Sequence, residues 1–189
     1  MGYVAAPVLG RPDAAAAGKL EILAAGTPDQ IARVQILLDV IGHETWHFGD
    51  RPEQANATKL GANFMIAGAI EAMGEAASPV ERYDVSGRSF LEMITSTLFL
   101  GPVHAGYGRM IANQQYEPAG FKMTLALKDV RLVLEAAERA ATPMPFASFL
   151  KDSLLDAIAH GAADHDWARW PRFRRDGQDV DRQVIAATE

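Results

Sequence analysis

The feature that most constrains the fold is a change of pattern at Arg51-Pro52. Before this point, short apolar runs alternate with turn residues, which is typical of an α/β arrangement. After it, apolar residues recur at helical spacing for most of the chain, and the interruptions contain glycine and proline. We therefore divide the chain into a small α/β part, residues 1–51, and an all-α part, residues 52–189.

The α/β part is predicted to hold three short strands and one helix. Thr27 is a predicted N-cap with Pro28 at the first helical position, and the helix that they open is expected to end at Gly42. The order strand, strand, helix, strand is similar to the far end of a nucleotide-binding sheet. The predicted strands are Tyr3–Val8, Leu20–Ala24 and Thr45–Phe48.

The all-α part is predicted to begin with a long alanine-rich helix from Pro52 to about Ala77. Its glycines weaken it as an isolated helix, so we expect other helices to pack against it. The tail from Trp170 onward is charged, and we expect it to be loose. Further helices are predicted at residues 89–99, 103–112, 121–141 and 145–160.

Composition excludes several classes of protein. Hydrophobic residues make up 49% of the chain, enough for a sizeable core, and the absence of cysteine excludes a disulfide scaffold and a thiol nucleophile. The net charge of −6 argues against nucleic acid as a partner. No apolar run approaches ~18 residues, so no membrane association is expected. We expect a soluble protein in the cytoplasm.

The segment His43-Glu44-Thr45-Trp46-His47 matches the H-E-x-x-H motif of zinc peptidases. On a helix both imidazoles would reach one zinc, Glu44 would activate water, and Glu71 could be a third ligand. Thr45, Trp46 and Phe48 instead favour a strand, in which positions i and i+4 lie about 13 Å apart. A zinc peptidase therefore stays a remote alternative, and we expect no metal site.

His160 and His165, together with Asp164 and Asp166, form a second group of possible metal ligands. They follow Gly161 or lie close to it, where a helix is expected to end, in a polar loop. We interpret all four as solvated loop residues.

Two lysines lie on predicted helix faces that carry apolar residues. Lys59 shares a face with Asn56 and Asn63, at spacings of three and four residues. A lysine in apolar surroundings either extends to water or is retained for function, because desolvation lowers the pKa of an ammonium group and makes it a proton donor near neutral pH. The pattern alone leaves both interpretations open.

The second face belongs to the helix that begins near Phe121. Phe121, Leu125, Lys128 and Leu132 follow helical spacing and place a lysine on an aromatic and aliphatic stripe. Asp129 lies beside Lys128, where it could pair with Lys59 or simply face solvent.

Four stretches together resemble the β-hydroxyacid dehydrogenase family, which includes 3-hydroxyisobutyrate dehydrogenase and the glyoxylate and succinic semialdehyde reductases. The resemblance covers nearly the whole chain, and the paired lysine motifs are its most specific part. The stretches are YVAAPVLGRPDAAAAGKLEILAAG from Tyr3, KLGANF from Lys59, FKMTLALKDVRLVLEAA from Phe121 and TPMPFAS from Thr142.

The resemblance implies a mainly α fold: a helical C-terminal domain of the 6-phosphogluconate dehydrogenase-like type, residues 52–189, preceded by a small α/β remnant of a Rossmann domain, residues 1–51. It implies an oxidoreductase that uses NAD or NADP on a small hydroxyacid, aldehyde or keto acid, and that forms a homodimer or homotetramer. It does not decide between NAD and NADP, because the ribose-reading residue belongs to the glycine-rich half.

The resemblance also implies roles for particular residues. Lys59 would be the catalytic general acid and base, and Asn63 would hold that lysine or the substrate. Lys128 would reach the cofactor, while Phe121 and Asp129 would line the substrate site. Gly10 would lie in the loop that grips the substrate carboxylate.

Two departures from the family pattern affect these expectations. Many relatives read Ser-Gly-Gly where this chain reads Leu9-Gly10-Arg11, so a hydroxyl is lost. Arg11 either replaces it in binding carboxylate or points outward and holds the edge of the sheet. The glycine-rich G-x-G-x-x-G turn is absent, and on the order of 100 residues of the dinucleotide-binding half are missing. We therefore expect weak or absent NAD(P) binding by this chain alone. A non-catalytic helical dimerisation module is the alternative, with an interface on the long helix and residues 90–100.

Overall fold

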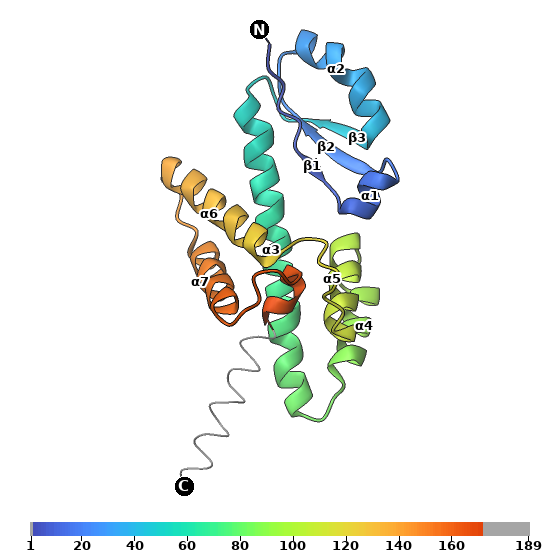
Figure 1. Ribbon diagram of the computed structural model, residues 1–189, viewed down its shortest axis with the longest axis vertical. Helices are drawn as coiled ribbons and strands as arrows, with labels where there is room; N and C mark the ends of the chain where they lie inside the picture. The colour runs from blue at the N-terminus through green and yellow to red at the C-terminus, as the bar shows by residue number, and fades with distance from the viewer. Residues whose placement is uncertain (1, 172–189) are drawn as a thin grey trace. The chain divides into compact units, whose positions relative to one another are not determined.

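The computed structural model describes residues 2–171, which form two compact units that divide between Asn63 and Phe64. The long helix α3, Pro52–Arg82, begins in the first unit and continues into the second (Figure 1). The sequence places a boundary at residue 51, where α3 begins. The boundary between the compact units falls further along the helix, because the first turns of α3 pack on the sheet: Ala55 is fully buried in the core of the first unit.

The first unit is built on a three-stranded sheet in the order β1-β2-β3. β1 is antiparallel to β2, and β2 is parallel to β3. The elements are β1 (Val8–Leu9), α1 (Pro12–Ala16), β2 (Leu20–Ala24), α2 (Pro28–Ile41) and β3 (Gly42–His47).

Both faces of β2 are covered, which makes this strand the centre of the first unit. Ile22 packs with Ile31 and Leu38 of α2 on one face. On the other face, Leu23 packs with Ala55 of α3. This two-sided burial explains why the strand is apolar from Ile22 to Ala24.

The predicted elements of the first unit are confirmed with three differences. β1 is shorter than Tyr3–Val8, although an isolated bridge joins Ala5 to Ala25. β3 begins at Gly42, three residues earlier than predicted, because α2 leads directly into it. The short helix α1 was not predicted; Pro12 occupies its first position.

The second unit is helical. In Figure 1, α4 pairs with α5 and α6 pairs with α7, and the two pairs flank the C-terminal part of α3. α3 continues past the predicted end near Ala77 to Arg82, even though it contains Pro79. The further elements are α4 (Gly87–Thr97), α5 (Pro102–Asn113), α6 (Met123–Arg139), α7 (Pro145–Ala159) and the short 3-10 helix η1 (Trp167–Arg169).

The segment after α7 forms part of the core of the second unit. Trp170 is fully buried, and its indole Nε1 donates a hydrogen bond to the buried carboxylate of Glu71 on α3. The expectation that the chain is loose from Trp170 onward is therefore wrong for Trp170 itself and for Pro171, which is also buried. The rest of that predicted tail, residues 172–189, lies outside the described residues.

The mainly helical fold with a small α/β part is confirmed. Over residues 2–171, none of the helices combines the length and the apolar character needed to cross a membrane.

Candidate functional site

Lys59 lies on the second turn of α3 and reaches back to the sheet of the first unit. Its Nζ donates a hydrogen bond of 2.5 Å to the carbonyl oxygen of Val8, at the start of β1. The side chain is half-buried. The sequence left open whether Lys59 simply extends to water. The hydrogen bond to Val8 shows that its ammonium group instead contacts the protein backbone. The ammonium group is thereby fixed beside the two-residue strand β1.

That loop begins at Gly10, which adopts a backbone conformation that favours glycine. Its φ is +142°, and a Cβ at this position would lie only 2.6 Å from Cδ2 of Leu20. Gly10 follows Val8 by two residues, so the strand end that holds the Lys59 ammonium also carries this exposed glycine backbone. An uncovered backbone beside an ammonium group suits a small anion.

Asn63 lies one helical turn after Lys59, and only 7% of it is exposed. Asn56, on the preceding turn, is exposed. Burial on this predicted face therefore increases along the helix, from the exposed Asn56 through the half-buried Lys59 to the buried Asn63. This brings Lys59 and Asn63 onto neighbouring turns of one face.

In the second unit, α6 has one buried face and one exposed apolar stripe. Leu125 and Leu132 are 44% and 40% exposed, and Lys128 between them is also exposed. Phe121, just before the helix, is half-buried and packs against the core. The predicted stripe is present, and it is an unburied apolar surface that carries a cation. The residues that α6 buries are Met123, Ala126, Leu127, Asp129, Val130, Val133 and Ala137.

Asp129 lies on the buried side of α6 and pairs with its neighbour. Its carboxylate contacts Nζ of Lys128, and its side chain is only 10% exposed while that of Lys128 is 58% exposed. The alternative that Asp129 simply faces solvent is therefore wrong. The carboxylate holds the ammonium group of a lysine whose side chain is mostly exposed.

Asp166 organises the segment that leads into α6, and the sequence analysis missed it. It is fully buried, not solvated as expected. Its Oδ2 accepts hydrogen bonds from the backbone N–H groups of Gly120 (2.9 Å) and Phe121 (3.1 Å), and its Oδ1 accepts one from Ala168 (3.1 Å). The signal that could have revealed it is Trp167 beside it, since tryptophan in a short polar loop is usually buried.

The ring of Phe121 is placed by the same segment. Its centroid lies 4.8 Å from that of Trp167. Asp166 and Trp167 therefore fix both the backbone and the side chain of Phe121.

The neighbours of Asp166 differ from it. Asp164 is 85% exposed and pairs with Lys122 at 2.8 Å. The hydrogen bond from Lys122, with the lysine's charge as a further cause, lowers the pKa of the Asp164 carboxyl. Nε2 of His165 lies 3.1 Å from a carboxylate oxygen of Glu117, and His160 is exposed. The solvated interpretation is confirmed for Asp164 and His160.

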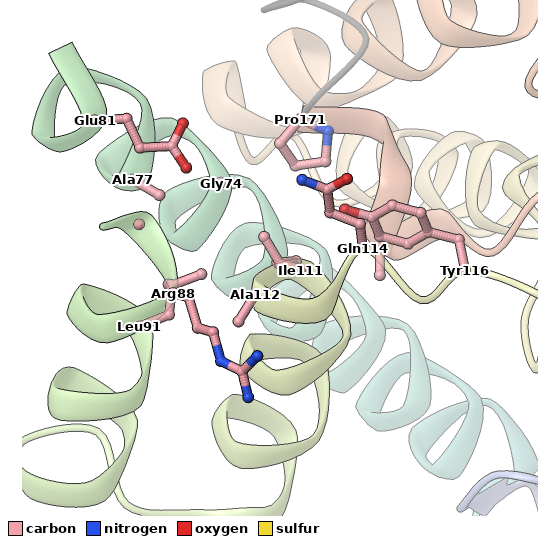
Figure 2. A pocket seen from close by; sticks show the side chains of 12 residues that line it. Gly74, Ala77, Glu81, Arg88, Leu91, Ile111, Ala112, Gln114, Tyr116 and Pro171 are labelled. Carbon is pink, nitrogen blue, oxygen red and sulfur yellow. The ribbon is translucent and has the colours of Figure 1, made fainter. Parts of the chain in front are cut away.

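Figure 2 shows a small cavity between α3, α4 and α5 in the second unit. Its volume is about 40 Å³, which leaves room for a few water molecules but not for a nicotinamide or a hydroxyacid. Pro171 lines the cavity, and Gly74 leaves room for it, because a Cβ at Gly74 would collide with the proline ring. This cavity contains none of the residues that the sequence singled out.

The H-E-x-x-H segment lies entirely on β3. The strand interpretation of this segment is therefore confirmed, and the helical geometry of a zinc peptidase is absent from it. Glu71, the possible third ligand, is instead bonded to Trp170.

Residues 54–172 match the family described as the NAD-binding domain of NADP-dependent 3-hydroxyisobutyrate dehydrogenase. The chain is 42% identical over 166 residues to the uncharacterised oxidoreductase YfjR of Bacillus subtilis, covering 88% of this chain and 58% of YfjR. It is 26% identical to glyoxylate/succinic semialdehyde reductase 1 of Arabidopsis thaliana, covering 88% of this chain and 57% of that protein.

Solved structures show the same fold. A 3-hydroxyisobutyrate dehydrogenase from Salmonella typhimurium matches 90% of this chain with a TM-score of 0.82 at 20% identity. The enzyme of the same name from Mycobacterium tuberculosis matches 91% with a TM-score of 0.79 at 24% identity. The match covers 60% of each of those chains. This chain thus spans less than two thirds of the length of these relatives.

Proposed function

The chain belongs to the 3-hydroxyisobutyrate dehydrogenase family of β-hydroxyacid dehydrogenases. We propose that it functions as part of an NAD(P)-dependent oxidoreductase. The reaction interconverts a small hydroxyacid and the corresponding aldehyde or keto acid. The observation that carries this proposal is the Lys59 ammonium, held by the Val8 carbonyl two residues before the exposed Gly10. Residues 52–189 act as the 6-phosphogluconate dehydrogenase-like helical domain, and residues 1–51 as the last strands of a Rossmann domain.

Lys59 moves the proton in this reaction. In the reducing direction, its ammonium group donates a proton to the carbonyl oxygen as a hydride reaches the carbonyl carbon. In the oxidising direction, the neutral amine takes the hydroxyl proton back. The bound nicotinamide supplies or accepts the hydride. The hydrogen bond to Val8 fixes the position of Nζ, which a flexible lysine side chain would otherwise leave variable.

Gly10 and Asn63 bind the substrate. Gly10 is exposed, so a carboxylate can reach its backbone from solvent. The carboxamide of Asn63 holds either the Lys59 ammonium or a substrate oxygen. Arg11, which stands where relatives carry glycine, offers a guanidinium group that binds carboxylate with two parallel hydrogen bonds.

The residues on and before α6 fit a dinucleotide with a charged phosphate group. Lys128 supplies the cation for a cofactor phosphate, and Asp129 restrains it through their ion pair. Phe121 and the exposed leucines of the stripe supply apolar surface. Asp129 and Phe121 also border the bound substrate in this proposal.

The cofactor site also needs a glycine-rich turn, which the printed sequence does not contain. We therefore expect this chain alone to bind NADH or NADPH weakly or not at all. The test joins the chain to the remainder of YfjR that it does not match, and assays reduction of glyoxylate and of succinic semialdehyde. Oxidation of NADH or NADPH that depends on the aldehyde supports the proposal. A folded chimera without such activity on any small aldehyde or keto acid contradicts it.

The second candidate, a helical dimerisation module, rests on a different observation. Leu98, Phe99 and Leu100, which directly follow α4, are 76%, 50% and 72% exposed. Burying these side chains between two copies would remove a large apolar surface from water. Light scattering on the unaltered chain and on a Leu98→Ser, Leu100→Ser variant tests this surface. A dimer that dissociates in the variant supports the interface, and it is compatible with the homodimer or homotetramer expected of the oxidoreductase. A dimeric chimera with no reductase activity favours the module alone.

A further inference from the structure

We propose that Glu21, His43 and Glu44 form a binding site for a zinc-like divalent cation on the sheet of the first unit. One carboxylate oxygen from each glutamate and one imidazole nitrogen all lie within 4.8 Å of one another. All three residues are in β2 or β3.

A register shift explains how two consecutive residues of a strand reach the same partner. Side chains of successive residues in a regular strand point to opposite faces. Here Leu20 pairs with Gly42 and Glu21 pairs with Glu44, so His43 is an extra residue opposite that step of β2. Such a bulge places two residues of one strand opposite one residue of the other and redirects a side chain. His43 and Glu44 therefore both face Glu21.

The spacing is close to that of a tetrahedral zinc site. Nδ1 of His43 lies 3.4 Å from Oε1 of Glu21. Two ligands at 2.0–2.1 Å from zinc in tetrahedral geometry are roughly 3.4 Å apart. The remaining separations, up to 4.8 Å, close by rotation of exposed side chains. His43 is 66% exposed and Glu21 39% exposed, so an ion can enter from solvent.

The chemistry of the ligands selects the ion. Two carboxylates opposite one another on adjacent strands repel each other, and a divalent cation removes this repulsion. The imidazole favours zinc over magnesium, which prefers a shell made only of oxygen. Three protein ligands leave a fourth position for water. The bound ion links β2 to β3.

Trp46, two residues after Glu44 on β3, contacts this group through a hydrogen bond. Its indole Nε1 donates a 2.7 Å hydrogen bond to Oε2 of Glu21. This bond orients the carboxylate and leaves Oε1 toward His43. It also makes the fluorescence of Trp46 a reporter of an ion bound at Glu21.

The site differs from the zinc motif that the sequence contains. H-E-x-x-H would use His43 and His47 together, whereas this group uses His43 and Glu44 with a residue of β2. His47 lies on the same strand and is exposed, but it is not part of the group. This makes His47→Ala a matched control for His43→Ala.

The experiment titrates the metal-free, untagged full chain with zinc in competition with a chromophoric chelator, and follows in parallel the tryptophan fluorescence, to which Trp46 contributes together with Trp167 and Trp170. We expect one zinc per chain. Glu21→Gln, His43→Ala and Glu44→Gln should each weaken binding by roughly tenfold or more, while His47→Ala should change it by less than about twofold. Circular dichroism checks that each variant folds. Millimolar magnesium should not displace the zinc.

Three results would overturn the proposal. One is the absence of saturable zinc binding by the unaltered chain. Another is binding by His43→Ala that equals that of the unaltered chain. The third is a loss in His47→Ala as large as in His43→Ala, which would assign the ion to the two histidines. Binding at these residues does not depend on oxidoreductase activity, so a failed reductase assay leaves this test unaffected.

Discussion

Replacing Asp166 with alanine tests how the segment before α6 is held. The carboxylate is fully buried and accepts hydrogen bonds from the backbone N–H groups of Gly120, Phe121 and Ala168. A hydrogen bond to a charged group contributes about 1.5–3 kcal/mol, and an unpaired buried donor is costly. Three such bonds, reduced by relaxation of the loop and entry of water, give a loss of about 3–5 kcal/mol in the free energy of unfolding.

The assay is thermal and urea unfolding, followed by tryptophan fluorescence. Trp167 and Trp170 are buried in the core of the second unit and report on it directly. A loss of this size lowers the melting temperature by roughly 6–20 °C at about 2–4 °C per kcal/mol. Asp166→Asn, which keeps the volume and one acceptor oxygen, should lose less and remains measurable if the alanine variant does not fold.

Asp164→Ala is the matched control, because Asp164 lies in the same loop but is 85% exposed. Its removal should leave the melting temperature almost unchanged. Equal melting temperatures for Asp166→Ala and Asp164→Ala would refute the reasoning, since the buried hydrogen bonds would then contribute nothing that a surface ion pair does not.

Three other perturbations have defined outcomes. Gly10→Ala should lower the free energy of unfolding by about 1–3 kcal/mol in urea, because of its positive φ and the contact with Leu20. Gly61→Ala, at a helix position with open space, should instead raise the free energy of unfolding by up to about 1 kcal/mol. A Gly61→Ala variant less stable than Gly10→Ala would contradict the assigned backbone strain. In the active chimera, Lys128→Ala should raise the Kd for NADPH by roughly tenfold and leave the KM for aldehyde nearly constant, while an effect on KM alone would contradict a cofactor role. Lys122→Gln should raise the pKa of Asp164 toward its ordinary value in an NMR titration. The lowered pKa of Asp164 favours its ionised carboxylate in the folded state, so the pair with Lys122 stabilises the fold at pH values above the pKa of the unfolded chain. This contribution is lost as the pH falls through the pKa of Asp164 in the folded state. An unchanged pKa of Asp164 in Lys122→Gln would contradict the pairing.

The helices were predictable because residues close in sequence, above all prolines, determine where they begin. Pro52, Pro102 and Pro145 each stand at the start of a helix. α3 is longer than predicted because Pro79 lies in its last turn, where the lost hydrogen bonds are few. α1 was missed because five residues with no buried side chain give no periodic signal.

The candidate site was predictable only in part, because burial depends on contacts distant in sequence. Lys59 could be singled out from its helix face, but its bond to Val8 spans 51 residues. Asp166 was misread because its partners at Gly120 and Phe121 lie 46 and 45 residues away. The group around Glu21 depends on a register shift between strands, which no local pattern in His43-Glu44 reveals.

The most direct test of the central claim is the effect of Lys59→Ala on turnover in the chimera with YfjR. A general acid contributes about 10²–10⁴-fold to the rate. We predict that kcat falls by at least about 100-fold, while the Kd for NADPH and the melting temperature change little. Lys19→Ala, which removes an exposed lysine from the same unit, should leave kcat unchanged. A Lys59→Ala variant that retains the turnover of Lys19→Ala would contradict the assignment of Lys59 as the proton donor.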